Sequence, residues 1–596
     1  MPFRIWRSPY TRFGGLNSLC PDDCSDETMT AVDTYTDQQL QKIAENGFNA
    51  IWVHGVTANL IQHELFPEFG HHAHKHMERL QELIRHAARF GLKVFLYYQP
   101  VRSVAAANYS FWKHHADCRG QKEMATEQVL EENRDQEIEM YCLCTSVPRV
   151  KQWVQAGASQ IAAQLPGLGG VLLITGSEYP GHCYSHRVKR NPGEWTPLIE
   201  CPRCQEREPW EVAAELIKLV YTGIREHSQS MEIIAWNWGW TNWLPAPCRP
   251  MLELLPRDVI LMACCERGGT FDFAERPAHP INEYSLIYAG PSEVCQKTLQ
   301  SAQELGMRSM VKLQLGTTHE LGTVLNLPML NSIFQKASWL RKHPDIGFMG
   351  CWNFGNFSSA NTFAFNYFLR AETTDDKKAA LSAFAESYFP GCKSSLMLRA
   401  WDMFSEASKH FPFAIPFMYR GVQTHALSYR EIFRPGALTG QPVGCSYLHT
   451  PDRGDDLSGS VCMTPHEFSL NELIAALGKL TVLWQAGTRL FAEALPESSH
   501  FHLELGNAIV VGCIWQSTEN AYKAYRLRQH WSATHQIELR HIILSELAAV
   551  QTALPWVERD RRLGWHGEAH QRMFDPESMQ QKVEFLQEQL RAISEF

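Results

Sequence analysis

Short apolar runs recur between positions 48 and 352, and polar or aromatic residues follow nearly every one. Such runs are typical of strands buried on both faces, as in a parallel sheet. The clearest run is Val-Leu-Leu-Ile at 171–174, which leads into Thr-Gly-Ser-Glu-Tyr-Pro. A weaker pattern predicts a first strand at 11–17. The other predicted strands lie at 48–53, 94–98, 233–236, 259–262, 310–314 and 347–352.

Amphipathic stretches with a helical period separate these runs. Thr36 and Gln39 form a capping-box pattern before one of them, and Pro209 opens another. Counting the weak first strand, strand and helix alternate eight times, which predicts an α/β fold, a (β/α)8 TIM barrel over residues 1–373. A doubly wound open sheet is the alternative. No Gly-x-Gly-x-x-Gly turn follows any strand, and the polar or aromatic strand ends also favour the barrel.

Beyond Thr374 the strand patterns stop and helical patterns take over. A stretch rich in Gly, Pro and Asp at 435–465 is typical of a loop or linker. We therefore expect an all-α C-terminal domain over residues 374–596, which could also serve as the surface of a homo-oligomer. Its predicted helices lie at 379–410, 470–494, 505–529, 535–554 and 580–593.

Composition narrows the class of protein. The 596 residues are 44% hydrophobic and carry a formal net charge of −9, which indicates a soluble globular chain without a basic nucleic-acid surface. No apolar segment of signal-peptide or membrane-spanning type is found, so we expect a cytoplasmic protein with neither nucleic-acid nor membrane partners. In that compartment the 17 cysteines indicate free thiols or a metal site rather than a disulfide framework.

Residues at the predicted strand ends should converge on one face of the barrel. Tryptophan faces can cover the apolar C–H face of a sugar while polar side chains bond its hydroxyl groups. A single tryptophan would more simply fill the barrel mouth, but four together favour a carbohydrate-binding surface. The predicted substrate-binding residues are His54, Arg102, Tyr179, Trp236, Asn237, Trp238, Trp240, Lys312, Gln314, Trp352 and Asn353.

Three carboxylates are candidates for glycosidic-bond hydrolysis, which usually needs an acid and a nucleophile or base. Glu178 follows the predicted fourth strand, and desolvation among tryptophans would raise its pKa, as a general acid requires. Glu320 follows the seventh strand and Glu266 the sixth, and position favours Glu320 slightly as the partner. A salt bridge to Arg267 or a loop hydrogen bond is the structural alternative for either partner. In substrate-assisted hydrolysis the acetamide group of the sugar replaces the second carboxylate.

The segment after Glu178 predicts a metal site. Cys201 and Cys204 form a Cys-x-x-Cys pair, and with Cys183 and a histidine they supply the donors that tetrahedral Zn²⁺ prefers. We expect His186 as the fourth ligand, with His182 as the alternative. Four protein ligands would make the zinc structural. Reduced thiols without metal are the alternative, and zinc is slightly favoured because a long loop has little core of its own to order it. No organic cofactor is indicated.

Several motifs carry a resemblance to a known family. Leu-Ile-Thr-Gly-Ser-Glu at 173–178, after a helix preceded by Leu-Cys-Thr at 143–145, resembles the family-20 glycoside hydrolases, the β-N-acetylhexosaminidases. More closely, the chain is similar to bacterial family-20-like hydrolases. The resemblance covers roughly residues 1–370 and implies a (β/α)8 barrel with Glu178 as the acid. The matching pieces are Ser177-Glu178, Cys201-Pro202-Arg203-Cys204, the segment 236–240, the segment 283–285, the segment 312–314 with His319-Glu320, and the segment 562–564.

The sequence departs from the hexosaminidases at one functional position. In that family an Asp directly precedes the acid and orients the substrate acetamide, whereas this chain has Ser177 there. A mechanism with two carboxylates is therefore favoured over substrate assistance. We expect an exo-acting glycosidase for small oligosaccharides or glycosides, with N-acetylhexosaminides among the candidates. The alternative function is a non-catalytic sugar-binding or interaction protein on a degenerate barrel.

Overall fold

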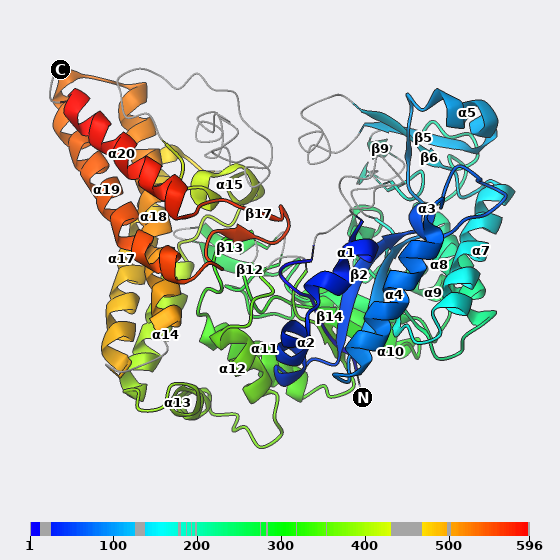
Figure 1. Ribbon diagram of the computed structural model, residues 1–596, viewed down its shortest axis with the longest axis horizontal. Helices are drawn as coiled ribbons and strands as arrows, with labels where there is room; N and C mark the ends of the chain where they lie inside the picture. The colour runs from blue at the N-terminus through cyan, green and yellow to red at the C-terminus, as the bar shows by residue number, and fades with distance from the viewer. Residues whose placement is uncertain are drawn as a thin grey trace. The chain divides into compact units, whose positions relative to one another are not determined.

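The computed structural model describes most of the chain, and its arrangement can be followed in Figure 1. The described residues are 2–11, 26–124, 138–176, 180–185, 188–191, 194–196, 199–273, 276–281, 284–317, 319–352, 355–430, 468–496 and 502–593.

Eight parallel strands form a closed barrel in the order β1-β15-β14-β11-β10-β7-β3-β2. The barrel closes where β1 pairs with two neighbours, because Ile5 is in register with both Ala50 and Met349. This topology confirms the predicted (β/α)8 barrel and excludes the open sheet. The barrel strands are β1 (Arg4–Trp6), β2 (Ala50–Val56), β3 (Lys93–Gln99), β7 (Gly170–Ile174), β10 (Glu232–Trp236), β11 (Ile260–Cys264), β14 (Ser309–Lys312) and β15 (Gly347–Met349).

The first strand differs from the prediction. It lies at Arg4–Trp6, earlier than the expected 11–17 segment, most of which is outside the described residues. Three residues with a polar first position are too few to show an alternating or apolar pattern. The other seven strands lie within a few residues of the predicted runs. Their burial explains the pattern, since all seven positions of β2 and all five of β11 are buried.

The helices begin where the capping residues predict. The Thr36 side chain accepts a hydrogen bond from the backbone N–H of Gln39, and the N-cap Glu208 forms a capping box with Glu211 across Pro209, the first helical residue. The helices of the barrel region are α1 (Glu27–Thr34), α2 (Asp37–Glu45), α3 (Thr57–Leu60), α4 (Ala73–Ala88), α5 (Tyr109–His115), α7 (Pro148–Gln164), α8 (Pro209–Arg225), α9 (Arg249–Leu254) and α10 (Glu293–Glu304).

Two insertions with small antiparallel sheets lie between barrel strands. The first follows β3 and forms a small antiparallel sheet in the order β4-β6-β5, from β4 (Val104–Ala105), β5 (Arg119–Met124) and β6 (Glu139–Leu143). The second follows β7 and contains the two-stranded sheet of β8 (Val188–Asn191) and β9 (Glu194–Thr196). Both insertions lie in connections at the carboxyl ends of barrel strands, where barrel enzymes carry their functional loops.

The chain divides into two compact units that interleave along the sequence. The first comprises residues 1–267, 291–313 and 344–350 and contains all eight barrel strands. The second comprises residues 268–290, 314–343 and 351–596. The predicted boundary near residue 373 remains a prediction.

The second unit is mainly helical, as expected for the C-terminal region. Its four long helices α17 to α20 pack in sequence order, each against the next (Figure 1). Two hairpins, β12 (Thr270–Phe273) with β13 (Arg276–Pro280) and β16 (Trp565–His566) with β17 (Gln571–Arg572), also belong to this unit. Its helices are α11 (Leu330–Arg341), α12 (Ala360–Phe368), α13 (Lys377–Tyr388), α14 (Ser394–Ser408), α15 (Ile415–Arg420), α17 (Leu470–Ala494), α18 (His502–Gln529), α19 (Gln536–Arg559) and α20 (Pro576–Ile593).

A buried ion pair joins three of these helices. Lys582 on α20 contacts Glu546 on α19, and both side chains are 2% exposed. Ser517 and Asn520 on α18 also donate hydrogen bonds to the Glu546 carboxylate, at 2.5 and 2.8 Å. Among the described residues, none of the helices has the length and apolar character needed to span a bilayer.

Candidate functional site

The exit of β7 is held by side chains from two other segments. His182 Nε2 donates to the Thr175 carbonyl at 2.6 Å, and Trp240 Nε1 donates to Thr175 Oγ1 at 2.9 Å. Gly239, with φ of 80°, lets its loop approach the β7 exit, since a Cβ there would lie 2.3 Å from the Gly176 carbonyl oxygen. The end of the strand that leads to Glu178 is therefore fixed by hydrogen bonds at Thr175 and by the close approach of Gly239 at Gly176.

Four of the predicted site residues lie outside the described residues. They are Glu178, Tyr179, His186 and Asn353.

The tryptophans after β10 divide into two kinds. Trp236 and Trp240 are each 1% exposed, and their indole N–H groups donate to Cys264 Sγ at 3.1 Å and to Thr175 Oγ1. Trp238 is partly exposed, and so is Trp352 after β15. The expected surface of four tryptophans is thus reduced, because Trp236 and Trp240 pack inward and have almost no area to offer a sugar.

Trp238 lies beside the exit of β11. The Arg267 guanidinium is stacked over the Trp238 ring, 4.4 Å from the ring centroid. Arg267 thus has a contact besides its position next to Glu266 in the sequence. Glu266 follows β11 by two positions and is 1% exposed. Asn237 Oδ1 accepts a hydrogen bond from the Cys264 N–H at 3.2 Å, which joins the ends of β10 and β11. A carboxylate, a guanidinium and a partly exposed indole therefore occur together at two adjacent strand ends.

A polar chain lies at the exits of β2 and β3. Gln99 Oε1 accepts from His54 Nε2 at 3.2 Å and from Arg102 Nε at 2.6 Å, while Gln99 Nε2 donates to Tyr97 Oη at 2.9 Å. Burial, with the nearby Arg102 charge, lowers the pKa of His54 well below its usual value, so this imidazole is neutral at physiological pH. Arg102 also lines a cavity of about 100 Å³, below the roughly 300 Å³ of ordinary ligand pockets.

The barrel unit contains a buried ion pair that the sequence patterns did not reveal. Arg7, directly after β1, contacts Glu27 at 2.7 Å, and both side chains are 0% exposed. The other Glu27 oxygen accepts the His54 N–H at 3.0 Å, and Arg7 is stacked over Trp52 at 4.1 Å. Burial raises the pKa of Glu27 to about 7, although the Arg7 charge opposes the shift. The local sequence offered one indication of this ion pair, namely that Arg7 directly follows the apolar residues Ile5 and Trp6.

In the second unit Glu320 is fully buried and bound by a turn. Its carboxylate accepts hydrogen bonds from Ser285 Oγ at 2.8 Å and from the N–H groups of Leu286 and Ile287 at 3.0 and 3.4 Å. Lys336 Nζ donates to the Ser285 carbonyl at 2.8 Å and to the Gln314 carbonyl at 3.0 Å. Burial raises the pKa of Glu320 to about 7, against these hydrogen bonds and the Lys336 charge. The carboxylate thus holds the turn at 285–287 in place.

Two further predicted residues, one at the end of β14 and one just after it, are also buried. Lys312, the last residue of β14, is 0% exposed, and its carbonyl accepts the Cys265 N–H at 2.8 Å. Gln314 is 1% exposed, and its Nε2 donates to the Thr317 carbonyl at 2.6 Å. These contacts stabilise the strand ends and the loop.

The predicted metal site gathers four cysteines. Cys183, Cys201 and Cys204 come together as expected, and Cys144 joins them at the end of β6. The alternative ligand His182 instead bonds Thr175 through Nε2 and accepts the Tyr184 N–H at Nδ1 at 3.2 Å. Cys144 was overlooked as a ligand because it lies 39 positions before Cys183, outside any local metal-binding spacing.

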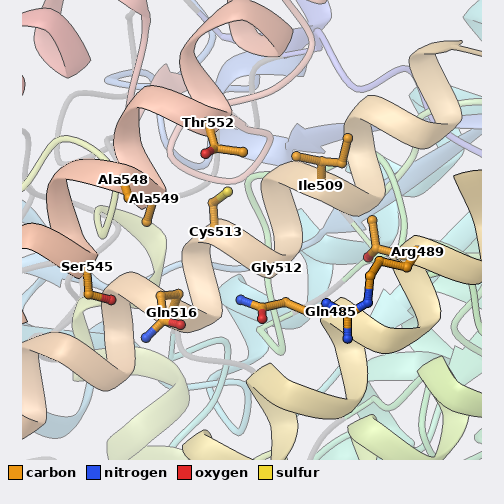
Figure 2. Close-up of a pocket in the computed structure, with 11 residues that line it drawn as sticks. Gln485, Arg489, Ile509, Gly512, Cys513, Gln516, Ser545, Ala548, Ala549 and Thr552 are labelled. Carbon is orange, nitrogen blue, oxygen red and sulfur yellow. The ribbon is translucent and has the colours of Figure 1, made fainter.

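A separate cavity of about 360 Å³ lies in the second unit among α17, α18 and α19. Figure 2 shows Gln485 and Arg489 of α17, Cys513 and Gln516 of α18 and Ser545 of α19 around it. Its size falls within the range of ligand pockets. None of the described residues that line it carries a carboxylate, so it lacks the acid that glycoside hydrolysis requires.

Comparison with known proteins finds likeness only at the level of solved structures, since no protein-family model and no curated protein matches the sequence. A GH138 enzyme targeting pectin rhamnogalacturonan II is similar with a TM-score of 0.50 and 9% identity, over 93% of this chain and 62% of that one. A GH5-4 broad specificity endoglucanase from Clostridium longisporum has a TM-score of 0.37 and 12% identity, over 62% of this chain and 94% of that one. Alpha-L-fucosidase isoenzyme 2 from Paenibacillus thiaminolyticus has a TM-score of 0.35 and 12% identity, over 63% and 49%.

The coverage and the sequence identity limit the likeness to the fold. This chain spans less than two thirds of the length of the GH138 enzyme, and sequence identity is too low to carry over an activity. The (β/α)8 barrel with a helical C-terminal region is a fold that this chain shares with the GH138 enzyme.

Proposed function

We propose that the protein is a glycoside hydrolase with Glu178 as its general acid. The observation that carries the proposal is the end of β7, the fourth barrel strand, whose last residue Ile174 lies four positions before Glu178. Barrel enzymes keep their reacting groups at this end of the strands. The fold shared with a GH138 enzyme is consistent with this chemistry, although a fold alone does not fix a function.

Glu266 is the second carboxylate that we favour. It follows the sixth strand, β11, and lies in the same compact unit as β7. The alternative, Glu320, already receives hydrogen bonds from Ser285, Leu286 and Ile287, which occupy both of its oxygens. In the proposed reaction Glu178 protonates the leaving oxygen, and Glu266 acts as nucleophile or as base toward water.

Trp238 and Arg267 are the proposed sugar-binding pair. The stacked guanidinium holds the partly exposed indole in place, so that ring can cover the apolar face of a sugar while Arg267 bonds its hydroxyl groups. The proposed substrates are small oligosaccharides or glycosides, with N-acetylhexosaminides among them. Ser177 in place of an orienting aspartate favours a mechanism with two carboxylates. The proposed ion for the cysteine cluster is Zn²⁺, and no organic cofactor takes part.

The experiment compares Glu178→Gln with the wild type on a panel of aryl glycosides. Loss of the acid should lower kcat by at least about 100-fold on the best substrate, since general acid catalysis contributes roughly 10²–10⁴. Glu206→Gln is the matched control, an exposed glutamate in the same β7-to-α8 connection, and should retain activity. Equal activity of Glu178→Gln and wild type would refute the assignment. Sugar binding without any released product would instead favour the non-catalytic alternative.

A further inference from the structure

We infer that Cys144, Cys183, Cys201 and Cys204 bind one structural Zn²⁺ ion, with Cys144 as the fourth ligand. All four side chains are buried, and their sulfur atoms lie within 4.8 Å of one another. The ligand set differs from the three cysteines and one histidine expected from the sequence. This inference concerns the metal site alone and does not depend on the glycosidase proposal.

The two sulfur separations from Cys144 match tetrahedral coordination. Cys144 Sγ lies 3.7 Å from Cys201 Sγ and 3.7 Å from Cys204 Sγ. With Zn–S bonds of about 2.3 Å, the edge of a regular ZnS₄ tetrahedron is about 3.8 Å. A disulfide would require about 2.05 Å between two sulfurs, so the four cysteines are not paired covalently.

The surroundings of the cluster suit thiolates. The Gln121 N–H donates to Cys183 Sγ at 3.3 Å, and Arg203 Nε donates to Cys144 Sγ at 3.4 Å. Four thiolates with Zn²⁺ carry a net charge of −2, which N–H donors and a guanidinium stabilise. Gly120 lets the Gln121 N–H approach Cys183, because a Cβ at position 120 would lie 2.7 Å from Cys183 Sγ.

The site joins segments that are distant in the sequence. Cys144 ends the insertion after β3, Cys183 follows β7, and the Cys201–Cys204 turn precedes α8. One ion therefore closes chain loops of 39 and 18 positions, and cross-links of this kind restrict the unfolded chain. Since all four ligands come from the protein, the zinc has no open position for substrate and is structural.

The site also has a contact with the barrel. His182, directly before the ligand Cys183, donates to the Thr175 carbonyl at the end of β7. The zinc therefore restrains the strand end from which the chain continues toward Glu178.

The first test uses the wild-type chain of 596 residues, purified without added metal. Elemental analysis and native mass spectrometry should find about one zinc per chain, because structural sites of this kind bind tightly. Titration with a thiol-specific mercurial should release that zinc into a chromogenic chelator as the buried thiols react. Less than half an equivalent of zinc, both as purified and after refolding with zinc, would overturn the inference. Iron in place of zinc would overturn the choice of ion, since a tetrahedral set of four sulfurs also suits iron.

The second test asks whether Cys144 is the ligand. Cys144→Ser should lower the zinc affinity, measured by competition with a chelator. The loss should exceed the roughly 10–100-fold that is typical when a hydrogen-bond partner of a ligand is removed. Cys142→Ser is the matched control, because Cys142 is equally buried two positions away and its Sγ donates to the His182 carbonyl at 3.5 Å. Equal zinc loss in both variants, or full retention by Cys144→Ser, would overturn the assignment. If Cys144→Ser fails to fold, X-ray absorption of the zinc-loaded wild type decides the ligand set, because four sulfur ligands at about 2.3 Å are expected and a nitrogen ligand at about 2.0 Å would overturn the assignment.

Discussion

Replacing Glu320 by glutamine should alter how stability depends on pH. Burial raises the pKa of this carboxyl from 4.5 to about 7, so the folded state holds the proton more tightly than the unfolded chain. The stability from this group is complete below the unfolded pKa of 4.5 and is lost as pH rises through 7. Glutamine keeps the shape of the protonated group but does not titrate, so Glu320→Gln should lack this loss.

The magnitude follows from the shift. One pKa unit corresponds to about 1.4 kcal/mol, so the unfolding free energy of the wild type should fall by about 3 kcal/mol relative to Glu320→Gln between about pH 4 and pH 8. The hydrogen bonds from Ser285 and Leu286 oppose this shift, because they stabilise the ionised carboxylate.

The assay is urea unfolding of both proteins across this pH range, with the difference between them plotted against pH. Glu588→Gln, at an exposed glutamate on α20, is the control and should differ from wild type by a constant amount. Infrared difference spectroscopy gives a direct reading, because the carboxylic acid band of Glu320 should titrate near pH 7 and vanish in the variant. A constant difference between wild type and Glu320→Gln, or a band that titrates at its ordinary pKa, would refute this reasoning.

Two further predictions concern other contacts. Lys582→Met should lower the unfolding free energy by about 3–5 kcal/mol, because it leaves the buried Glu546 without its cation, and Lys582→Met/Glu546→Leu should recover most of the loss in thermal melts. A cost below about 1 kcal/mol for the single variant would mean that the pair is hydrated. On an aryl glycoside substrate, Trp238→Ala should raise KM about tenfold with little change in kcat, since one sugar-covering ring contributes roughly 1.4 kcal/mol. Trp339→Ala, at a partly exposed tryptophan on α11, should leave KM unchanged, and equal effects in the two variants would refute the role of Trp238.

Local patterns predicted most of the fold because most elements have a local cause. The helix α17 occupies Leu470–Ala494 as expected, since the Ser469 capping box and a long apolar stripe define it. The buried runs at 171–174 and 233–236 likewise correspond to β7 and β10. The strand β1 was misplaced because three residues carry too little pattern, and only its pairing with β2 and β15 identifies it.

The site was harder to predict because its contacts are long-range. The sequence identified Cys201 and Cys204 through the Cys-x-x-Cys spacing and Cys183 as a third cysteine in the same segment, but Cys144 joins them only through folding. The sequence also placed Glu320 after β14, but could not reveal the turn at 285–287 that binds its carboxylate. No sequence motif predicts that Arg7 pairs with Glu27, which lies 20 positions later.

The closure of the barrel has a consequence for synthesis of the chain. Arg4 pairs with Phe348, 344 positions later, so β1 has no partner on that side until the eighth strand leaves the ribosome. At 5–20 residues per second this interval is roughly 17–70 s. During it the nascent sheet has two open edges, which are templates for pairing with other chains. The shortness of β1, three residues, and of β14, four residues, limits what these edges offer, and chaperones that cover nascent sheets should raise the yield of folded protein.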